Sequence, residues 1–435
     1  MAIYFVKRML QKCELVRIIT VACKADRLLH GSPARNLKKA KVLLMKAWKK
    51  AVGALAMTTL VASMFTGCGK KDAAKDNGNE IKIGALFELT GNVANYGKST
   101  YKGVQLAVEQ INAKGGINGK KIKLVEADNK SEPSESGNAA TKLITKDKVS
   151  VIIGPATSGC VSAATPVVTN SKVPLMAPVA TAPGITVDEK GKVRPFIFRA
   201  CFTDPFQGKL MAKFAVETLK LKNIAIFYDS SSDYSKGLMD VFGKTLEEKG
   251  GKVVGKEAFL AKDQDFKSAL TKLKASNPEA LYVPGYYEEV SKIIKQAREV
   301  GLTCPILGSD GWDSPKLAQI AGAEALNGTY FTSAYSAQDK DPHVQQFIKD
   351  YKAKFNEEPD TFAIHAYDGT LAVAEAIKQA GGTDGTKIAE ALSKIKDLQV
   401  ATGKYTLDKD HNPVSGGIII EMKDGVQTFK QKITL

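Results

Sequence analysis

Short apolar runs alternate with longer amphipathic segments from Ile81 to the end of the chain. The segment 101–112 is predicted to be a helix, because its apolar residues recur at spacings of three and four. Strands are predicted at 81–89, 115–128, 149–154, 173–178, 223–229, 279–285 and 304–310, and further helices at 209–220 and 290–301. Strands that alternate with helices in this way predict an α/β fold built on mostly parallel sheets.

The alternating part of the chain is too long for a single ordinary core, so two domains are expected. The pattern breaks at 195–208, where Pro and small polar residues gather, and restarts at Ile224. A second break lies at 328–342. Both halves repeat the same strand and helix pattern, which indicates two similar lobes joined by more than one crossing of the chain.

The first 80 residues have a different composition. They contain sixteen Lys or Arg and five Asp or Glu, which gives +11 of the total net charge of +16. An uncharged run at 51–64 follows Lys49 and Lys50, and it is shorter than the roughly 20 residues of a membrane-spanning helix. This pattern is typical of a signal peptide. The basic pI therefore belongs mainly to the leader.

The sequence Phe65-Thr-Gly-Cys68 directly after the uncharged run resembles the lipobox of bacterial lipoproteins, although Phe65 stands where Leu is preferred. Cys68 is therefore predicted to carry lipid and to become the mature N-terminus, with 45–67 as the signal peptide. The polar segment 68–80 is predicted to be a flexible tether. No function is assigned to the basic leader 1–44, and the start codon is either Met1 or Met45.

The remaining charge and the cysteines exclude two classes of function. Lysines after residue 80 are scattered among acids, which is typical of solvated helix faces rather than a nucleic-acid surface. Cys160, Cys201 and Cys304 show no close Cys or His spacing of the kind that binds zinc. One disulfide among them is possible, and none is required.

Three loops carry the residue types of a binding site. The segment 90–100 looks at first like a phosphate loop, but five residues separate Gly91 from Gly97 where that motif has four. Ser158 and Thr181 follow apolar strands, at the edge where doubly wound sheets bind ligands. Their hydroxyls suit a carboxylate, and the alternative is that each one caps the helix that follows.

Seven fragments in this order resemble the branched-chain amino-acid-binding proteins of ABC importers, which have the type I periplasmic-binding fold. They are GALFELTGNVANYGKSTYKGVQLAVEQINAKGGINGKKIKLVEAD, VIIGPATSG, VPLMAPVATAP, FRACFTDPFQG, YVPGYYEEV, QAREVGL and ILGSDGW. The resemblance covers 81–435 and implies two lobes with a three-strand hinge, each a doubly wound, mostly parallel sheet flanked by helices. It implies an N-terminal lobe of 81–201 and 333–410, and a C-terminal lobe of 202–332 and 411–435.

The same resemblance implies roles for nine residues. Ser158 and Thr181 would hold the ligand's carboxylate, the backbone at Val179 would lie near its ammonium, and Asp310 would neutralise that ammonium. The remaining residues are aromatic. Tyr96 would line the cleft, Tyr234 and Tyr286 would close over the ligand, and Trp312 and Phe362 would wall its side chain, with core packing as the alternative for each.

These residues predict a binding protein rather than an enzyme, with no cofactor and no metal. The expected partners are an amino acid, most simply Leu, Ile or Val, and the permease of an ABC importer, with the protein monomeric, extracytoplasmic and lipid-anchored. Amides, urea and other small polar solutes remain alternative ligands. A hydrolase with Ser158 or Cys160 as nucleophile is a rival, but no Gly-x-Ser-x-Gly motif surrounds Ser158. A sensory module of the same fold is a third alternative.

Overall fold

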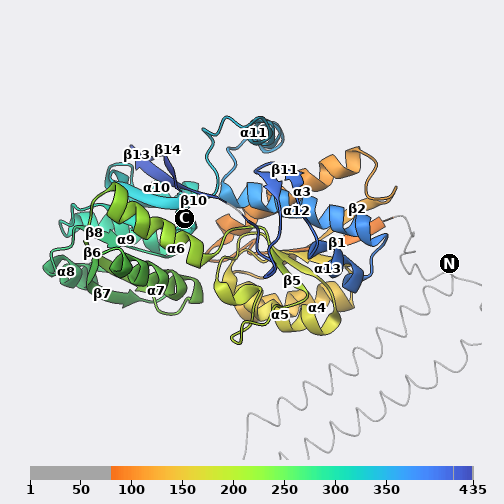
Figure 1. The fold of residues 1–435 in the computed structure, drawn as a ribbon, viewed down its shortest axis with the longest axis horizontal. Helices are drawn as coiled ribbons and strands as arrows, with labels where there is room; N and C mark the ends of the chain where they lie inside the picture. The colour runs from red at the N-terminus through yellow and green to blue at the C-terminus, as the bar shows by residue number, and fades with distance from the viewer. Residues whose placement is uncertain (1–79, 415, 434–435) are drawn as a thin grey trace, which may run out of the picture. The chain divides into compact units, whose positions relative to one another are not determined.

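The computed structural model describes residues 80–414 and 416–433. Within this part the strands form two large sheets and one small one. Figure 1 shows that each large sheet has its own set of helices. We call the elements around the first large sheet the N-terminal lobe, and those around the second the C-terminal lobe.

The N-terminal lobe is built on a parallel sheet of five strands in the order β2-β1-β3-β4-β5. The strands are β1 (Glu80–Phe87), β2 (Lys121–Asp128), β3 (Val151–Ile153), β4 (Leu175–Ala177) and β5 (Ile197–Arg199). The helices are α3 (Ala94–Ala113), α4 (Pro133–Thr145), α5 (Ser158–Ser171), η1 (Pro183–Ile185), α11 (Pro342–Phe355), α12 (Thr361–Ala380) and α13 (Gly385–Leu392). The hairpin of β11 (Leu398–Val400) and β12 (Gly403–Tyr405) follows them.

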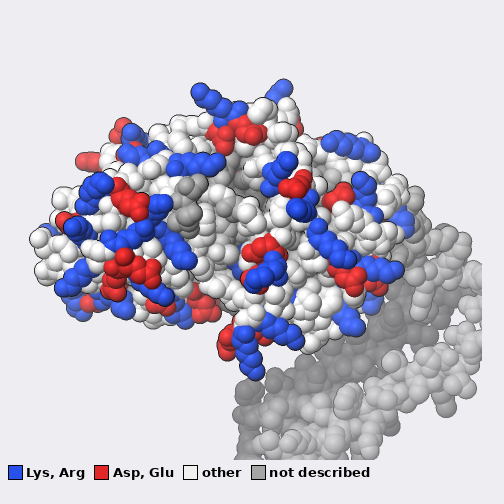
Figure 2. All heavy atoms as spheres, in the orientation of Figure 1, with Lys and Arg blue, Asp and Glu red and all other residues white. Residues whose placement is uncertain are grey.

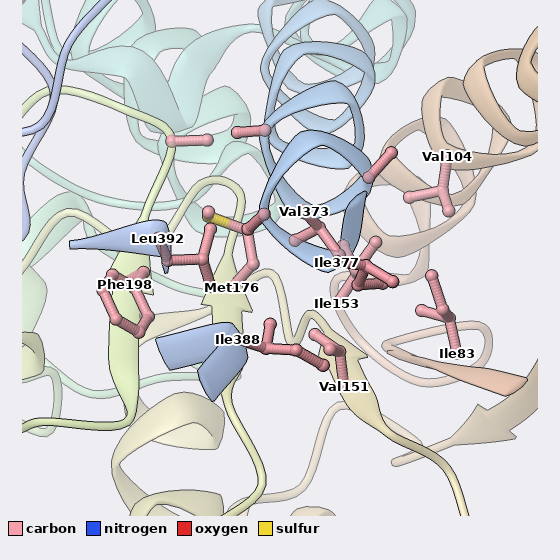
Figure 3. Packing of buried hydrophobic residues seen from close by; sticks show 14 of the residues in the cluster. Ile83, Val104, Val151, Ile153, Met176, Phe198, Val373, Ile377, Ile388 and Leu392 are labelled. Atoms are coloured by element: carbon pink, nitrogen blue, oxygen red, sulfur yellow. The ribbon is translucent and has the colours of Figure 1, made fainter. Parts of the chain in front are cut away.

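Helices cover both faces of this sheet because its strands are apolar on both sides. Figure 3 shows one face, where Ile83 and Met176 of the strands meet Val104 of α3 and Ile377 of α12. The opposite face packs against α4 and α5 through Leu86 and its neighbours. At roughly 25 cal/mol per Å² of buried apolar area, these two cores supply the main driving force for folding of the lobe.

The C-terminal lobe is built on a mixed sheet of seven strands in the order β14-β13-β10-β9-β8-β6-β7. Its strands are β6 (Asn223–Asp229), β7 (Lys252–Phe259), β8 (Ala280–Tyr282), β9 (Ile306–Gly308), β10 (Thr329–Ser333), β13 (Gly417–Lys423) and β14 (Val426–Ile433). Its helices are α6 (Asp204–Lys213), η2 (Phe214–Thr218), α7 (Asp233–Glu248), α8 (Lys267–Ala275), α9 (Tyr287–Glu299), η3 (Asp310–Trp312), α10 (Pro315–Ala321) and η4 (Glu324–Leu326). The pairs β10–β13 and β13–β14 are antiparallel, and the other neighbouring strands of this sheet are parallel.

The chain passes between the two sheets after β5, after β10 and after β12. The first passage differs from the predicted break at 195–208, because α6 already begins at Asp204. Three local features start the helix there: the Thr203 hydroxyl accepts a hydrogen bond from Phe206 N, Asp204 lies in the first turn, and Pro205 follows it. The limits of the two lobes in residue numbers stay predictions.

The segment that resembled a phosphate loop is mostly helix. Helix α3 begins at Ala94, so Gly97 and Lys98 lie inside its first turns. A Cβ atom at Gly97 would lie 2.2 Å from the carbonyl oxygen of Glu88, so a glycine is needed for the helix to approach strand β1. This glycine serves packing, and no ring of loop amides forms around a phosphate.

The surface shown in Figure 2 carries Lys and Arg interspersed with Asp and Glu over both lobes. None of the helices in the described part of the chain is long and apolar enough to cross a membrane. The predicted signal peptide, the lipidated Cys68 and the tether lie outside the described residues, apart from Glu80.

Candidate functional site

The carboxyl ends of the strands in both sheets lead to one cavity with about 270 Å³ of space free of protein atoms, part of it open to solvent. Its lining comes from both lobes: Tyr96, Ala156, Thr157, Ser158, Val179, Thr181, Tyr234, Tyr286, Asp310, Gly311 and Phe362. The structure thus brings together the predicted site residues with the exception of Trp312.

Ser158 lies at the N-terminus of helix α5, where unpaired backbone N–H groups and the helix dipole favour an anion. Glu88, which follows strand β1, holds the loop that leads into this helix. Its carboxylate accepts hydrogen bonds from Ala156 N at 2.9 Å, from Thr157 N at 3.0 Å and from the Thr157 hydroxyl at 2.8 Å. Because Glu88 is fully buried, these bonds fix the position of the helix start relative to the sheet.

The loop that carries Thr181 is held by Arg199, a fully buried residue of strand β5. The Arg199 guanidinium donates to the carbonyl oxygens of Ala180 at 3.1 Å and Ala182 at 2.8 Å. Ala182 N in turn donates to Ser158 Oγ at 3.2 Å, which connects the two hydroxyl-bearing loops. The alternative role as a helix cap is not seen for Ser158, because its hydroxyl bonds to Ala182 and it lies inside the helix.

Asp310 lines the cavity from the C-terminal lobe and is nearly fully buried. Its Oδ1 accepts hydrogen bonds from the Tyr234 hydroxyl at 2.6 Å and from Gln207 Nε2 at 3.0 Å. Burial raises the pKa of the Asp310 carboxyl to about 6, and the bonds from Tyr234 and Gln207 act against that rise. A buried carboxylate with no cationic side chain bonded to it is suited to a cationic ligand group.

The aromatic residues form the walls of the cavity. Tyr96 contacts Tyr286 and Phe362 edge to face, with ring centroids 5.6 Å and 4.8 Å apart. Tyr234 stacks on Tyr286 at 5.0 Å. These buried rings exclude water, so a charged group that enters the cavity must be satisfied by the polar side chains described above.

Tyr96 also joins the two lobes directly. Its hydroxyl donates to the carbonyl oxygen of Gly311 and accepts a hydrogen bond from Tyr287 N at 2.9 Å. Asn95 Nδ2 donates to Ser314 Oγ at 2.7 Å in the same region. Tyr96 is thus at once a wall of the cavity and a contact between the lobes.

Trp312 is the predicted site residue that does not line the cavity. It is fully buried in the core of the C-terminal lobe, with its ring 6.3 Å from that of Phe331, and its Nε1 donates to the carbonyl oxygen of Val283 at 3.0 Å. The 3-10 turn at 310–312 directs Asp310 into the cavity and Trp312 into the core. Trp312 is therefore a core residue, which was the alternative considered for each aromatic side chain.

Cys160, one of the two candidate nucleophiles of the rival enzyme, lacks activated surroundings. Burial raises the pKa of the Cys160 thiol far above its usual range, so it stays protonated. Burial lowers the pKa of His365 to about 4, and its ring packs edge to face against Phe202. Cys160, Cys201 and Cys304 are free thiols. No group of three or more His, Cys, Asp or Glu side chains suited to a metal occurs in the described ranges.

Four residues that organise the site were missed from the sequence: Glu88, Arg199, Asp204 and Gln207. A signal existed for two of them, because Glu88 and Arg199 interrupt otherwise apolar strand sequences. Asp204 and Gln207 lie at the start of a helix, where polar residues are ordinary. Their relation to Asp310 appears only in the folded protein.

Two α/β lobes with a cavity between their strand ends have the architecture of proteins that enclose a small solute. A family model described as periplasmic binding protein matches residues 80–427. The Leu/Ile/Val-binding protein homolog 3 of Brucella melitensis is 33% identical over 328 residues, which are 75% of this chain and 87% of the relative.

Two solved structures agree with this match. The branched-chain amino acid transporter substrate binding protein LivJ of Streptococcus pneumoniae, in complex with isoleucine, is 41% identical with a TM-score of 0.77, covering 81% of this chain and 99% of that one. The leucine binding protein LivK of Thermotoga maritima is 36% identical with a TM-score of 0.76, covering 81% and 98%. The chain therefore belongs to the periplasmic binding protein family, whose members are substrate-binding proteins and not enzymes. The predicted resemblance and the two-lobed fold are confirmed.

Proposed function

We propose that this chain is the solute-binding protein of an ABC importer, and that it captures a branched-chain amino acid between its lobes and delivers it to the membrane permease. The observation that carries the proposal is the division of polar groups in the cavity. Ser158, Thr181 and the N-terminus of α5 come from the N-terminal lobe, and Asp310 comes from the C-terminal lobe. A zwitterion would place its carboxylate at the groups of the N-terminal lobe and its ammonium at Asp310 of the C-terminal lobe.

The energetics favour such a ligand. A charge removed from water is costly unless it gains a dedicated partner, so a carboxylate belongs at the hydroxyls and the helix N-terminus, and an ammonium belongs at Asp310. The rest of the lining is apolar or aromatic, with Val179, Tyr286 and Phe362 among its members. These side chains would receive an aliphatic group and gain from its burial.

The relatives support the choice of amino acid. The Brucella relative is named for Leu, Ile and Val, and the Streptococcus structure is a complex with isoleucine. An amide or urea would satisfy fewer of the charged groups, because neither carries both a carboxylate and an ammonium. We therefore expect amino acids to bind more tightly than uncharged solutes.

A thermal-shift screen of residues 80–435 tests the proposal. Leu, Ile and Val should raise the melting temperature, because a ligand at a hundred times its Kd adds about 2.7 kcal/mol to the free energy of unfolding. Leucinamide and isoamylamine serve as matched ligands that lack the carboxylate charge, and urea serves as a neutral solute. Stabilisation by urea or an amide alone, with no effect of any amino acid, would refute the proposal.

We further propose that Cys68 anchors the protein to the outer face of the cell membrane. The support is the Phe65-Thr-Gly-Cys68 sequence after an uncharged run. Cys68→Ala should release the protein from the membrane fraction. Wild-type protein found soluble, with 45–67 still attached, would contradict the anchor.

A further inference from the structure

Two buried carboxyl groups lie beside the candidate ammonium position and share one amide. Gln207 Nε2 donates to Asp204 Oδ1 and to Asp310 Oδ1, each at 3.0 Å, so the two oxygens lie within about 6 Å of one another. The orientation of this amide is fixed, because Gln207 Oε1 accepts from Asp310 N at 3.2 Å and from the Thr332 hydroxyl at 2.7 Å. Both amide protons are therefore used, one on each acid.

Asp204 has less compensation than Asp310. It is fully buried, and its Oδ2 has no donor at full hydrogen-bond geometry among the described residues, although the Thr181 hydroxyl interacts with the carboxyl and acts to lower its pKa. Asp204 does not line the cavity. Its backbone N–H donates to the carbonyl oxygen of Thr181, which does line the cavity, at 2.9 Å. A missing hydrogen bond to a buried carboxyl group costs much free energy when the group is charged and much less when it is protonated.

The groups that act on this pair supply little positive charge. The nearby cation is Arg199, whose guanidinium is already bonded to main-chain carbonyls. The other titratable groups around the pair stay neutral near pH 7, because burial raises their pKa values: Cys201, Tyr234, Tyr282 and Tyr286. Asp313 adds a further acid near Asp310. The pair therefore faces one cation, Arg199, and a third acid, Asp313.

Such a pair does not ionise in a single step. Burial and then the charge of Asp310 raise the pKa of Asp204 to about 8, while the pKa of Asp310 rises to about 6. Two interacting carboxyl groups in a dry site lose their protons one after the other. The two apparent pKa values therefore describe the pair and not either residue alone.

We propose that Asp204 and Asp310 carry one proton between them in the ligand-free protein, and that the ligand's ammonium displaces this proton into solvent. The inference rests on the proposed function, because it takes an ammonium group as the ligand's cation. The exchange balances in charge: one positive charge enters the site and one proton leaves it. Asp204 acts through electrostatics and through Gln207, so it is a positioning residue that does not touch the ligand.

The sign of the pH dependence follows. An ammonium beside the pair favours the ionised carboxylates and lowers both pKa values in the complex. Binding is therefore strongest above the ligand-free value of about 8 and weakens as the pH falls through about 8 and then about 6. If Asp310 alone controlled binding, the affinity would fall only near the lower of these two pH values.

Calorimetric titration of residues 80–435 with L-isoleucine at pH 7, in phosphate and in Tris, measures the protons released on binding. The wild type should release close to one proton, because a group with a pKa of about 8 is about nine-tenths protonated at pH 7 and Asp310 adds about one tenth. Asp204→Asn should release about 0.1, the share left by Asp310. The matched control is Asp368→Asn, another fully buried acid with a pKa raised to about 7, which binds the loop at Ala401 and Thr402 and not the cavity.

The outcomes separate this inference from the proposed function. Wild-type protein that binds isoleucine and releases no proton would overturn the inference while leaving the proposed function intact, whatever the variants do. Equal release by wild type and Asp204→Asn would also overturn it, by removing Asp204 from the exchange. If no amino acid binds the wild type in the thermal-shift screen, the proposed function fails and this inference fails with it.

Discussion

Asp310 shows how much a single residue depends on its surroundings. Its carboxyl lies in the cavity, is bonded by Tyr234 and Gln207, and contacts no basic side chain through a hydrogen bond or ion pair among the described residues. From the sequence, its place at the end of a predicted strand and the family resemblance together assigned it to the site. Its partners could not be assigned, because Gln207 lies 103 residues away and meets it only across the folded lobe.

Removing the Asp310 charge tests its role at this scale. Asp310→Asn keeps the shape of the side chain, and we expect binding of isoleucine to weaken by about 2 to 5 kcal/mol, the usual cost of leaving one member of a buried charge pair alone. Calorimetry at pH 8 gives the affinity. Asp240→Asn, an exposed acid on α7, is the matched control and should bind like the wild type. Equal affinities of all three proteins would reject the role of Asp310.

At the scale of elements, the sequence predicted most of the strands that end at the cavity. Strands β3, β4, β6, β8 and β9 each fall within a predicted segment, and β1 begins one residue before its segment, because buried parallel strands are continuously apolar. Strands β5, β7, β10, β13 and β14 were not predicted. The second predicted break, at 328–342, was wrong at its start, because β10 occupies Thr329–Ser333 as a buried interior strand. Strands β7 and β14 lie at the two edges of the second sheet and carry many exposed polar residues. Edge strands owe their structure to pairing with a neighbour, which a local pattern does not record.

Helix α5 depends on a contact outside itself. Its start is held by Glu88 through bonds to Ala156 and Thr157, so Glu88→Ala would leave buried donors unsatisfied. We expect the free energy of unfolding to fall by about 1 to 3 kcal/mol, and ligand affinity to fall as well, because Ser158 would lose its fixed position. Denaturant titration and calorimetry measure the two effects.

A second substitution at this position serves as the comparison. Glu88→Gln retains one acceptor oxygen and should lose less stability than Glu88→Ala. Wild-type stability and affinity in Glu88→Ala would show that the N-terminus of α5 is positioned by other contacts.

At the scale of the whole molecule, the lobes meet through side chains beside the cavity. The Tyr96 hydroxyl bonds to Gly311 and Tyr287, and Asp313 Oδ2 accepts from Thr361 N of helix α12 at 2.8 Å. A ligand that contacts both lobes would favour the closed arrangement only through the extra contacts it makes there. The sequence predicted the division of site residues between lobes, but not these direct bonds, which depend on the relative placement of the two sheets.

Tyr96→Phe should therefore favour a more open molecule. The change removes one hydroxyl and keeps the ring, so we expect about a tenfold loss of affinity, about 1.4 kcal/mol, together with a smaller ligand-induced decrease in the radius of gyration. Small-angle scattering with and without isoleucine measures the second effect. Tyr282→Phe is the matched control, because the Tyr282 hydroxyl is buried and no described residue forms a hydrogen bond with it. A Tyr96→Phe protein that binds and closes like this control would contradict a role of the hydroxyl in closure.

The crystal structure of residues 80–435 with L-isoleucine is the most direct test of a zwitterion held between the lobes. We predict that the ligand's carboxylate lies at hydrogen-bonding distance, about 2.7 to 3.2 Å, from Ser158 and Thr181 and from a backbone N–H at the start of α5. Its ammonium should lie at a similar distance from Asp310, and its aliphatic side chain against Phe362. A ligand bound outside this cavity, or bound with its carboxylate beside Asp310, would contradict the account.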